Sequence, residues 1–140
     1  MTTVHIARAV GTTGSDLPAY RADVRAGTHN LVADEPAVGG GGDLGPSPFG
    51  LVLSGLAACT AMTLRMYAER QGWVPITIEV DVRYDVDVDA GRRNIERTIT
   101  MPADLTSEQR TRLAEIAERT PVTLAIREGT AITTTIRERD

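Results

Sequence analysis

Apolar and polar residues alternate along the chain from Ile76 to Val88, which is the most regular pattern in the sequence. A period of two places the apolar residues on one face of a strand and the charged residues on the other, as in a half-buried β-strand. Asp89-Ala-Gly91 follows as a turn, and Ile95 to Met101 is the predicted returning strand. The pattern therefore predicts an antiparallel hairpin.

Shorter strands are predicted in the first third of the chain. Residues 4–10 alternate weakly, and residues 20–25 and 29–33 flank Ala26-Gly27-Thr28. A glycine in a short connection between two such runs is typical of a β-hairpin. A glycine-rich loop follows from Val38 to Pro46, and we expect it to be flexible and without regular structure.

The longest apolar stretch predicts a helix that begins at Ser47-Pro48 and runs to about Gln71. Serine is a good N-cap, proline fits the first helical turn, and Gly72 is a C-terminal stop. Apolar residues occupy nearly every face from Leu51 to Leu64. Because a helix without a polar face is surrounded by protein, we expect this one to be the long buried central helix of the fold.

The same stretch raises the question of a membrane segment, since residues 44–64 carry no charge. A spanning helix needs about 20 mostly apolar residues, whereas glycine, proline, serine and threonine recur throughout this stretch. The N-terminus has no apolar run followed by a small-residue cleavage site. We therefore expect a soluble, cytoplasmic protein with no membrane partner.

The last third of the chain predicts one clear helix. Thr106-Ser-Glu-Gln109 has the pattern of a capping box, and the helix after it turns Leu113, Ile116 and Ala117 inward. A threonine–proline pair ends that helix, a short helical or irregular piece follows, and residues 130–137 are predicted to form a last strand. The order is β-β-β-α-β-β-α-β, an α+β arrangement with antiparallel sheets in a single domain of residues 1–140.

Composition narrows the class of protein. The 15 basic residues of this 140-residue chain are all arginine and stand against 19 acidic ones. The net charge of −4 argues against a nucleic-acid partner. One cysteine excludes an intramolecular disulfide framework and a cysteine-rich metal site within one chain. His5 and His29 lack metal-ligand spacing, so we expect no bound metal.

Cys59 is the leading candidate for chemistry, midway along the apolar helix. A free cysteine also packs well as a small hydrophobe, and a reactive thiol needs a nearby cation or helix N-terminus. Since Cys59 lies about three turns into its helix, that cation has to be an arginine from elsewhere. Asp34-Glu35 is either a carboxylate pair for acid–base work or a strand-ending turn before Pro36. The glycine run 39–42 lacks the lysine of a phosphate-binding loop.

The segments that carry a resemblance are His29-Asn-Leu-Val-Ala-Asp-Glu-Pro36, Gly39-Gly40, Asp43-Leu-Gly-Pro-Ser-Pro48, Leu56-Ala-Ala-Cys-Thr-Ala-Met-Thr-Leu-Arg-Met-Tyr-Ala68, Arg97-Thr-Ile-Thr and Thr120-Pro-Val122. In this order and spacing they resemble the OsmC/Ohr family, and the similarity is closest to its YhfA-like and hydrolase-fused branch. The resemblance covers about residues 25–137.

The resemblance implies an intertwined homodimer with antiparallel sheets around packed central helices and active sites at the subunit interface. It also implies thiol-dependent reduction of organic hydroperoxides without metal or flavin, with Cys59 as the peroxidatic thiol. In this family an arginine and a glutamate hold the thiolate. Arg21 and Arg25 are the nearest candidates for the arginine, and Glu35 is the candidate for the carboxylate.

The sequence departs from the family at two positions. The second cysteine, which forms a disulfide with the oxidised first one, is Thr120 here, and the helix glutamate falls on Phe49 or Gly50. The leading hypothesis is therefore a one-cysteine or weakened hydroperoxide reductase that uses an external thiol. The alternatives are a thiol redox sensor, or a non-catalytic dimer that binds a small apolar ligand in an interface pocket lined by Phe49, Leu53, Leu56, Met62 and Met66.

Overall fold

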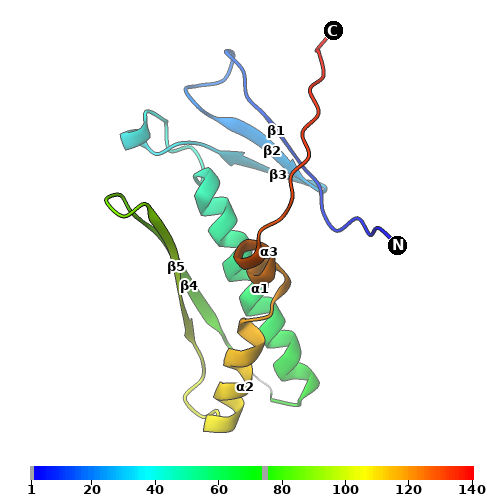
Figure 1. Ribbon diagram of the computed structural model, residues 1–140, viewed down its shortest axis with the longest axis vertical. Helices are drawn as coiled ribbons and strands as arrows, with labels where there is room; N and C mark the ends of the chain where they lie inside the picture. The colour runs from blue at the N-terminus through cyan, green and yellow to red at the C-terminus, as the bar shows by residue number, and fades with distance from the viewer. Residues whose placement is uncertain (1, 74–75) are drawn as a thin grey trace. The chain divides into compact units, whose positions relative to one another are not determined.

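The structure is a computed structural model that describes residues 2–73 and 76–140. The elements follow one another as β1-β2-β3-η1-α1-β4-β5-α2-α3 (Figure 1). The chain forms two compact units, Met1–Val52 and Leu53–Asp140. The mixture of helices with separate antiparallel sheets confirms the α+β class.

The N-terminal unit contains a three-stranded antiparallel sheet in the order β1-β2-β3. The predicted hairpin is confirmed as β2 (Ala22–Ala26) and β3 (His29–Ala33), and Gly27 in its turn has a φ of +60°. The strand predicted at residues 4–10 forms only as β1 (Ala9–Thr12). Ala9 pairs with Ala26, the last residue of β2. One more backbone hydrogen bond follows, from the Gly27 N–H to the Arg8 carbonyl at 3.1 Å, where the chain already turns away from β2.

The C-terminal unit contains the hairpin β4 (Glu79–Asp87) and β5 (Arg92–Thr100), as predicted. Their antiparallel register places Val82 opposite Arg97. The inward face of the hairpin is otherwise apolar and half-buried. It consists of Val80, Val82, Tyr84, Ile95 and Ile99.

Helix α1 (Pro48–Arg70) begins and ends where the sequence predicts. The Ser47 Oγ accepts a hydrogen bond of 3.0 Å from the Gly50 N–H, and Gly72 follows the helix with a left-handed φ of +75°. One stripe of the helix is buried, at four-residue spacing: Leu56, Thr60, Leu64 and Ala68.

The other apolar faces of α1 are not covered by the part of the chain that the structure describes. Phe49, Val52, Met62 and Met66 are all exposed, so the prediction that protein surrounds the whole helix is not met within this chain alone. By length and composition alone, α1 could also cross a membrane. The core helix of a soluble protein meets the same criterion, and the buried stripe of α1 packs on α2.

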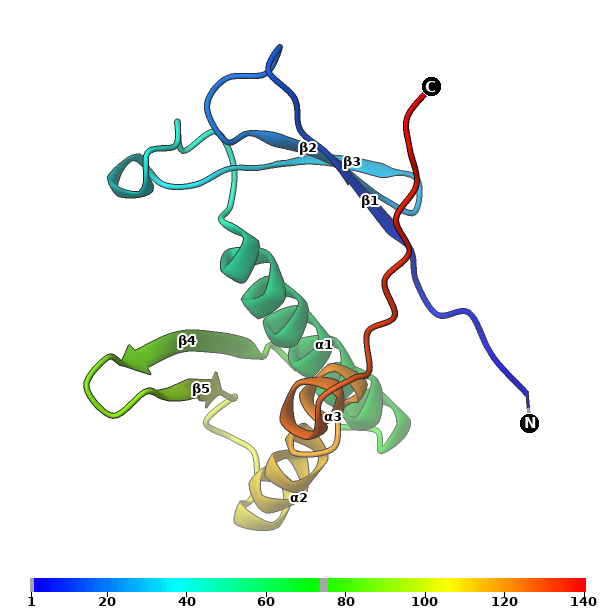
Figure 2. The same cartoon turned by 45° about the horizontal axis from the view of Figure 1, so that its top comes forward.

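Helices α2 (Ser107–Ala117) and α3 (Pro121–Glu128) complete the C-terminal unit (Figures 1 and 2). The predicted capping box is present, since the Thr106 Oγ1 accepts from the Gln109 N–H at 3.1 Å and the Thr106 N–H donates to Gln109 Oε1 at 2.9 Å. The core consists of Leu64 with Leu113 and Ala117. Half-buried hydrophobic side chains surround it: Tyr67, Trp73, Ile76, Ile78, Ile99, Met101, Leu105 and Ile116.

The predicted last strand at residues 130–137 is wrong for the isolated chain. The residues after α3 form neither helix nor strand, and Ile132 and Ile136 are 89% and 86% exposed. A strand forms only where its backbone pairs with another strand, and residues 130–137 pair with none of the described strands. The observed order therefore ends with two helices, β-β-β-α-β-β-α-α.

Replacing Leu113 with alanine tests the core of the C-terminal unit. Leu113 is fully buried against Leu64, so Leu113→Ala removes apolar contacts and leaves a cavity. We expect the free energy of unfolding to fall by about 2–5 kcal/mol, measured by urea denaturation. The matched control is Val38→Ala, because Val38 is almost fully exposed. We expect this control to change the free energy of unfolding by less than about 0.5 kcal/mol. Equal effects of the two substitutions would contradict this core.

Candidate functional site

Cys59 lies on α1 at the border between its buried and its exposed sides. The side chain is half-buried, and its Sγ lies 4.0 Å from the Thr63 Oγ1, one turn further along. Residues three to four apart share a helix face, so Cys59 belongs to the same stripe as Met62 and Met66, which are 60% and 46% exposed. The thiol is therefore partly accessible from the apolar side of α1.

The residues predicted to assist Cys59 lie in the N-terminal unit, whereas Cys59 lies in the C-terminal one. Arg21, just before β2, donates from Nε to Asp23 Oδ1 at 2.9 Å. Arg25 lies within β2 opposite Asn30, and Glu35 follows β3 with a half-buried side chain. Their roles toward Cys59 remain predictions.

Asp34 has a structural role that favours the turn interpretation of Asp34-Glu35. Its buried carboxylate accepts from three backbone N–H groups, those of Glu35 at 2.8 Å, Gly42 at 3.1 Å and Leu44 at 3.2 Å. A Cβ on Gly41 would lie 2.0 Å from the Glu35 carbonyl oxygen. The glycine loop is therefore closely packed. Its first two residues, Val38 and Gly39, lie in the 3₁₀ helix η1 (Ala37–Gly39), while residues 40–46 form neither helix nor strand, as predicted.

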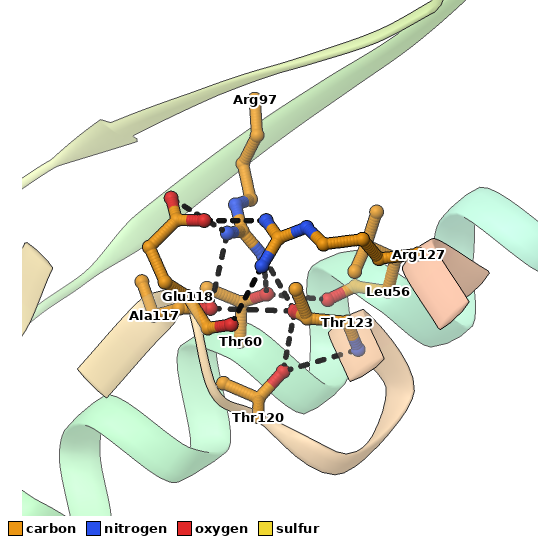
Figure 3. A network of polar contacts seen from close by, with 8 residues as sticks. All are labelled: Leu56, Thr60, Arg97, Ala117, Glu118, Thr120, Thr123 and Arg127. Carbon is orange, nitrogen blue, oxygen red and sulfur yellow. Dashed lines mark hydrogen bonds and ion pairs between the residues drawn. The ribbon is translucent and has the colours of Figure 1, made fainter. Parts of the chain in front are cut away.

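Arg97 is a buried cation that the sequence interpretation missed. Its side chain is 11% exposed, and Figure 3 shows how its guanidinium reaches three elements. Nη1 donates to the Thr60 Oγ1 at 3.0 Å and to the Thr123 Oγ1 at 2.8 Å, and Nη2 donates to the Ala117 carbonyl at 3.0 Å. A buried charge requires such partners, because desolvation without them is costly.

A sequence signal for Arg97 did exist. It stands between Ile95 and Ile99, two residues from each, so the period of two places it on the apolar face of its strand. A charged residue at an inward position is expected to find polar partners inside the protein. Those partners lie 37 and 26 residues away in the chain, and no local pattern identifies them.

Thr120, which the resemblance predicts to occupy the position of a second cysteine, belongs to the same network. It is fully buried and is the N-cap of α3, where its Oγ1 accepts from the Thr123 N–H at 3.4 Å. The two threonine hydroxyl oxygens lie 2.6 Å apart. A line of hydrogen bonds thus runs from Thr60 through Arg97 and Thr123 to Thr120 (Figure 3).

The outer side of the network is ionic. Glu118, at the end of α2, places its Oε1 3.6 Å from the Arg97 Nη2. Arg127 of α3 donates to the Glu118 carbonyl at 3.0 Å and also pairs with the Glu118 carboxylate. Glu118 is 58% exposed, so its charge is well screened by water. The charge of the Arg97 guanidinium is therefore stabilised mainly by its neutral acceptors, the Thr60 and Thr123 hydroxyls and the Ala117 carbonyl.

Comparison with known proteins places this arrangement in a family. A family model described as OsmC-like protein matches residues 40–135. A search of curated protein sequences finds no match.

Solved structures share the fold. An osmotic stress induced and detoxification response protein from Psychrobacter arcticus 273-4 is 19% identical, with a TM-score of 0.71 over 89% of this chain and 91% of that one. The organic hydroperoxide resistance protein OsmC of Legionella pneumophila is 20% identical, with a TM-score of 0.64 over 90% and 92%. The organic hydroperoxide resistance protein OhrB of Bacillus subtilis is 25% identical, with a TM-score of 0.60 over 88% and 91%.

The predicted resemblance is thus confirmed at the level of the family, while placement in the YhfA-like branch remains a prediction. The match covers the glycine loop, α1 with Cys59, the hairpin with Arg97, and the turn with Thr120. This chain belongs to the OsmC family.

Proposed function

We propose that this protein is a thiol-dependent organic hydroperoxide reductase in which Cys59 is the peroxidatic thiol. The observation that carries the proposal is the position of Cys59, half-buried on α1 inside the segment matched by the family model. It is the single cysteine of the chain. Structural relatives from Legionella pneumophila and Bacillus subtilis bear the name organic hydroperoxide resistance protein, which supports this substrate class.

The first chemical step oxidises Cys59. The thiolate sulfur attacks the distal oxygen of the hydroperoxide, so that an S–O bond forms while the O–O bond breaks. The sulfur loses two electrons and becomes a sulfenic acid. The peroxide is reduced to an alkoxide, which takes up the proton that the thiol released and leaves as an alcohol. We propose that Arg21 or Arg25 stabilises the thiolate and the alkoxide, and that Glu35 orients that arginine.

The second step requires a thiol from outside the chain. The hydroxyl of Thr120 cannot condense with a sulfenic acid to give a disulfide, and it is buried in hydrogen bonds to Thr123. An external thiol therefore attacks the Cys59 sulfenic sulfur, which forms a mixed disulfide and releases water. A second external thiol then attacks the mixed disulfide, regenerates the Cys59 thiol and leaves as a disulfide with the first one.

Intact mass spectrometry of the reduced protein tests the first step. With cumene hydroperoxide we expect a species one oxygen heavier, absent in Cys59→Ser. The rate at pH 7 should exceed that of free cysteine by about tenfold or more, because the proposed arginine stabilises the charge on the leaving alkoxide. Oxidation no faster than that of free cysteine would contradict the proposal and favour the apolar-ligand function.

We further propose that the protein is a homodimer. The exposed apolar side chains of α1, Met62 and Met66 among them, would be buried against the same face of a second copy, as a twofold interface requires. The alternating segment with Ile132 and Ile136, exposed and unpaired within the described chain, has the pattern of a strand that pairs with an edge in the partner. Both features support an intertwined arrangement.

Size-exclusion chromatography with light scattering tests the dimer. We expect a molar mass in solution of about twice the chain mass of 15.0 kDa. Met66→Glu should shift the mass toward that of one chain at micromolar concentration, because it places a charge in the apolar interface. The control Val88→Glu changes an exposed residue of the β4–β5 turn and should leave the dimer intact. A monomeric wild-type protein contradicts this arrangement.

A further inference from the structure

One arginine connects four elements of the C-terminal unit. Arg97 extends from β5 and donates to α1 at Thr60, to the end of α2 at Ala117, and to the first turn of α3 at Thr123 (Figure 3). The guanidinium is a planar fork whose donors have fixed directions. Three elements that accept from one fork are held in one relative position, and α1 is held at the turn that bears Cys59.

The hydrogen bond to Thr60 fixes the local shape of α1. A threonine hydroxyl has one hydrogen to donate and two lone pairs to accept with. Because Arg97 donates to the Oγ1, the hydroxyl hydrogen is directed to the Leu56 carbonyl, 2.7 Å away. A bond from a threonine hydroxyl to the carbonyl four residues back bends a helix slightly. Arg97 thereby sets the conformation of turn 56–60, in which Cys59 immediately precedes Thr60.

The network is costly to rearrange. The Arg97 side chain is only 11% exposed, and the nearest carboxylate, that of Glu118, lies 3.6 Å away on a side chain that is 58% exposed. If turn 56–60 moved away, a buried cation would lose one of its acceptors, and a buried polar group without a partner is strongly unfavourable. The network therefore disfavours a displacement of turn 56–60.

We propose that Arg97 is a positioning residue for the Cys59 thiol, acting through the Thr60 hydroxyl. Its effect on peroxide reduction rests on the proposed function, whereas its effect on the thiol itself does not. Attack on a peroxide needs the sulfur in line with the O–O bond, so a small displacement of turn 56–60 lowers the rate strongly. The same network also contains Thr120. It therefore links Cys59 to the position that the resemblance assigns to a second cysteine.

The test compares Thr60→Val with Thr60→Ser, and Arg97→Met with Arg83→Met. Valine keeps the shape of threonine without the hydroxyl, while serine keeps the hydroxyl. Arg83 belongs to the same hairpin but is 66% exposed, with Asp85 and Glu96 as partners. For each full-length variant, three quantities are measured: the melting temperature, the rate of Cys59 oxidation by cumene hydroperoxide, and the rate of Cys59 alkylation by iodoacetamide.

We expect Thr60→Val and Arg97→Met to slow oxidation by about 10- to 100-fold, the loss typical of a slightly misplaced reactive group. Both should also change the alkylation rate, while Thr60→Ser and Arg83→Met stay near wild type in both reactions. A lower melting temperature with both Cys59 rates unchanged would show a merely structural role and overturn the inference. The inference would also be overturned if Thr60→Ser lowered the Cys59 reaction rates as much as Thr60→Val does.

The two proposals can fail separately. If wild-type Cys59 reacts with hydroperoxide no faster than free cysteine does, the proposed function is wrong. The alkylation rates of the Thr60 pair still decide the positioning role, because alkylation needs no peroxide. Should Arg97→Met fail to fold, the Thr60 pair decides that role without it.

Discussion

A largely buried guanidinium needs hydrogen-bond acceptors, and this requirement organises the C-terminal unit. Arg97 finds its acceptors on α1, at the end of α2 and in the first turn of α3. The apolar contacts among Leu64, Leu113 and Ala117 supply burial, but such contacts have no preferred direction. The hydrogen bonds of Arg97 add the direction and fix how the three helices meet.

The chemistry that we propose follows from what this network holds. It contains Thr60, the neighbour of Cys59, at one end and Thr120 at the other. The position that the resemblance assigns to a second thiol is thus occupied by a buried hydroxyl. A chain with one thiol can be oxidised there by a peroxide but cannot form an internal disulfide. The catalytic cycle must then be completed by thiols in solution, which makes the reductant a determinant of turnover.

Local patterns predicted those parts of the fold that depend on local forces. The alternation of β4, the capping box of α2 and the glycine after α1 each have a local cause, and each prediction was confirmed. Residues 130–137 alternate equally well, yet a strand also needs a partner strand, and these residues pair with none of the described ones. Arg97 was missed because its partners are distant in sequence, and the close packing of the glycine loop was missed because it depends on one buried carboxylate, that of Asp34.

We propose that Cys59 reduces organic hydroperoxides repeatedly, with an external thiol as the electron donor. Turnover is measured as the amount of cumyl alcohol formed from cumene hydroperoxide in the presence of excess dithiol, compared between wild type and Cys59→Ser. We expect many molecules of alcohol per wild-type chain and only the background reaction for Cys59→Ser. Equal alcohol formation by the two proteins would show that Cys59 does not catalyse this reduction.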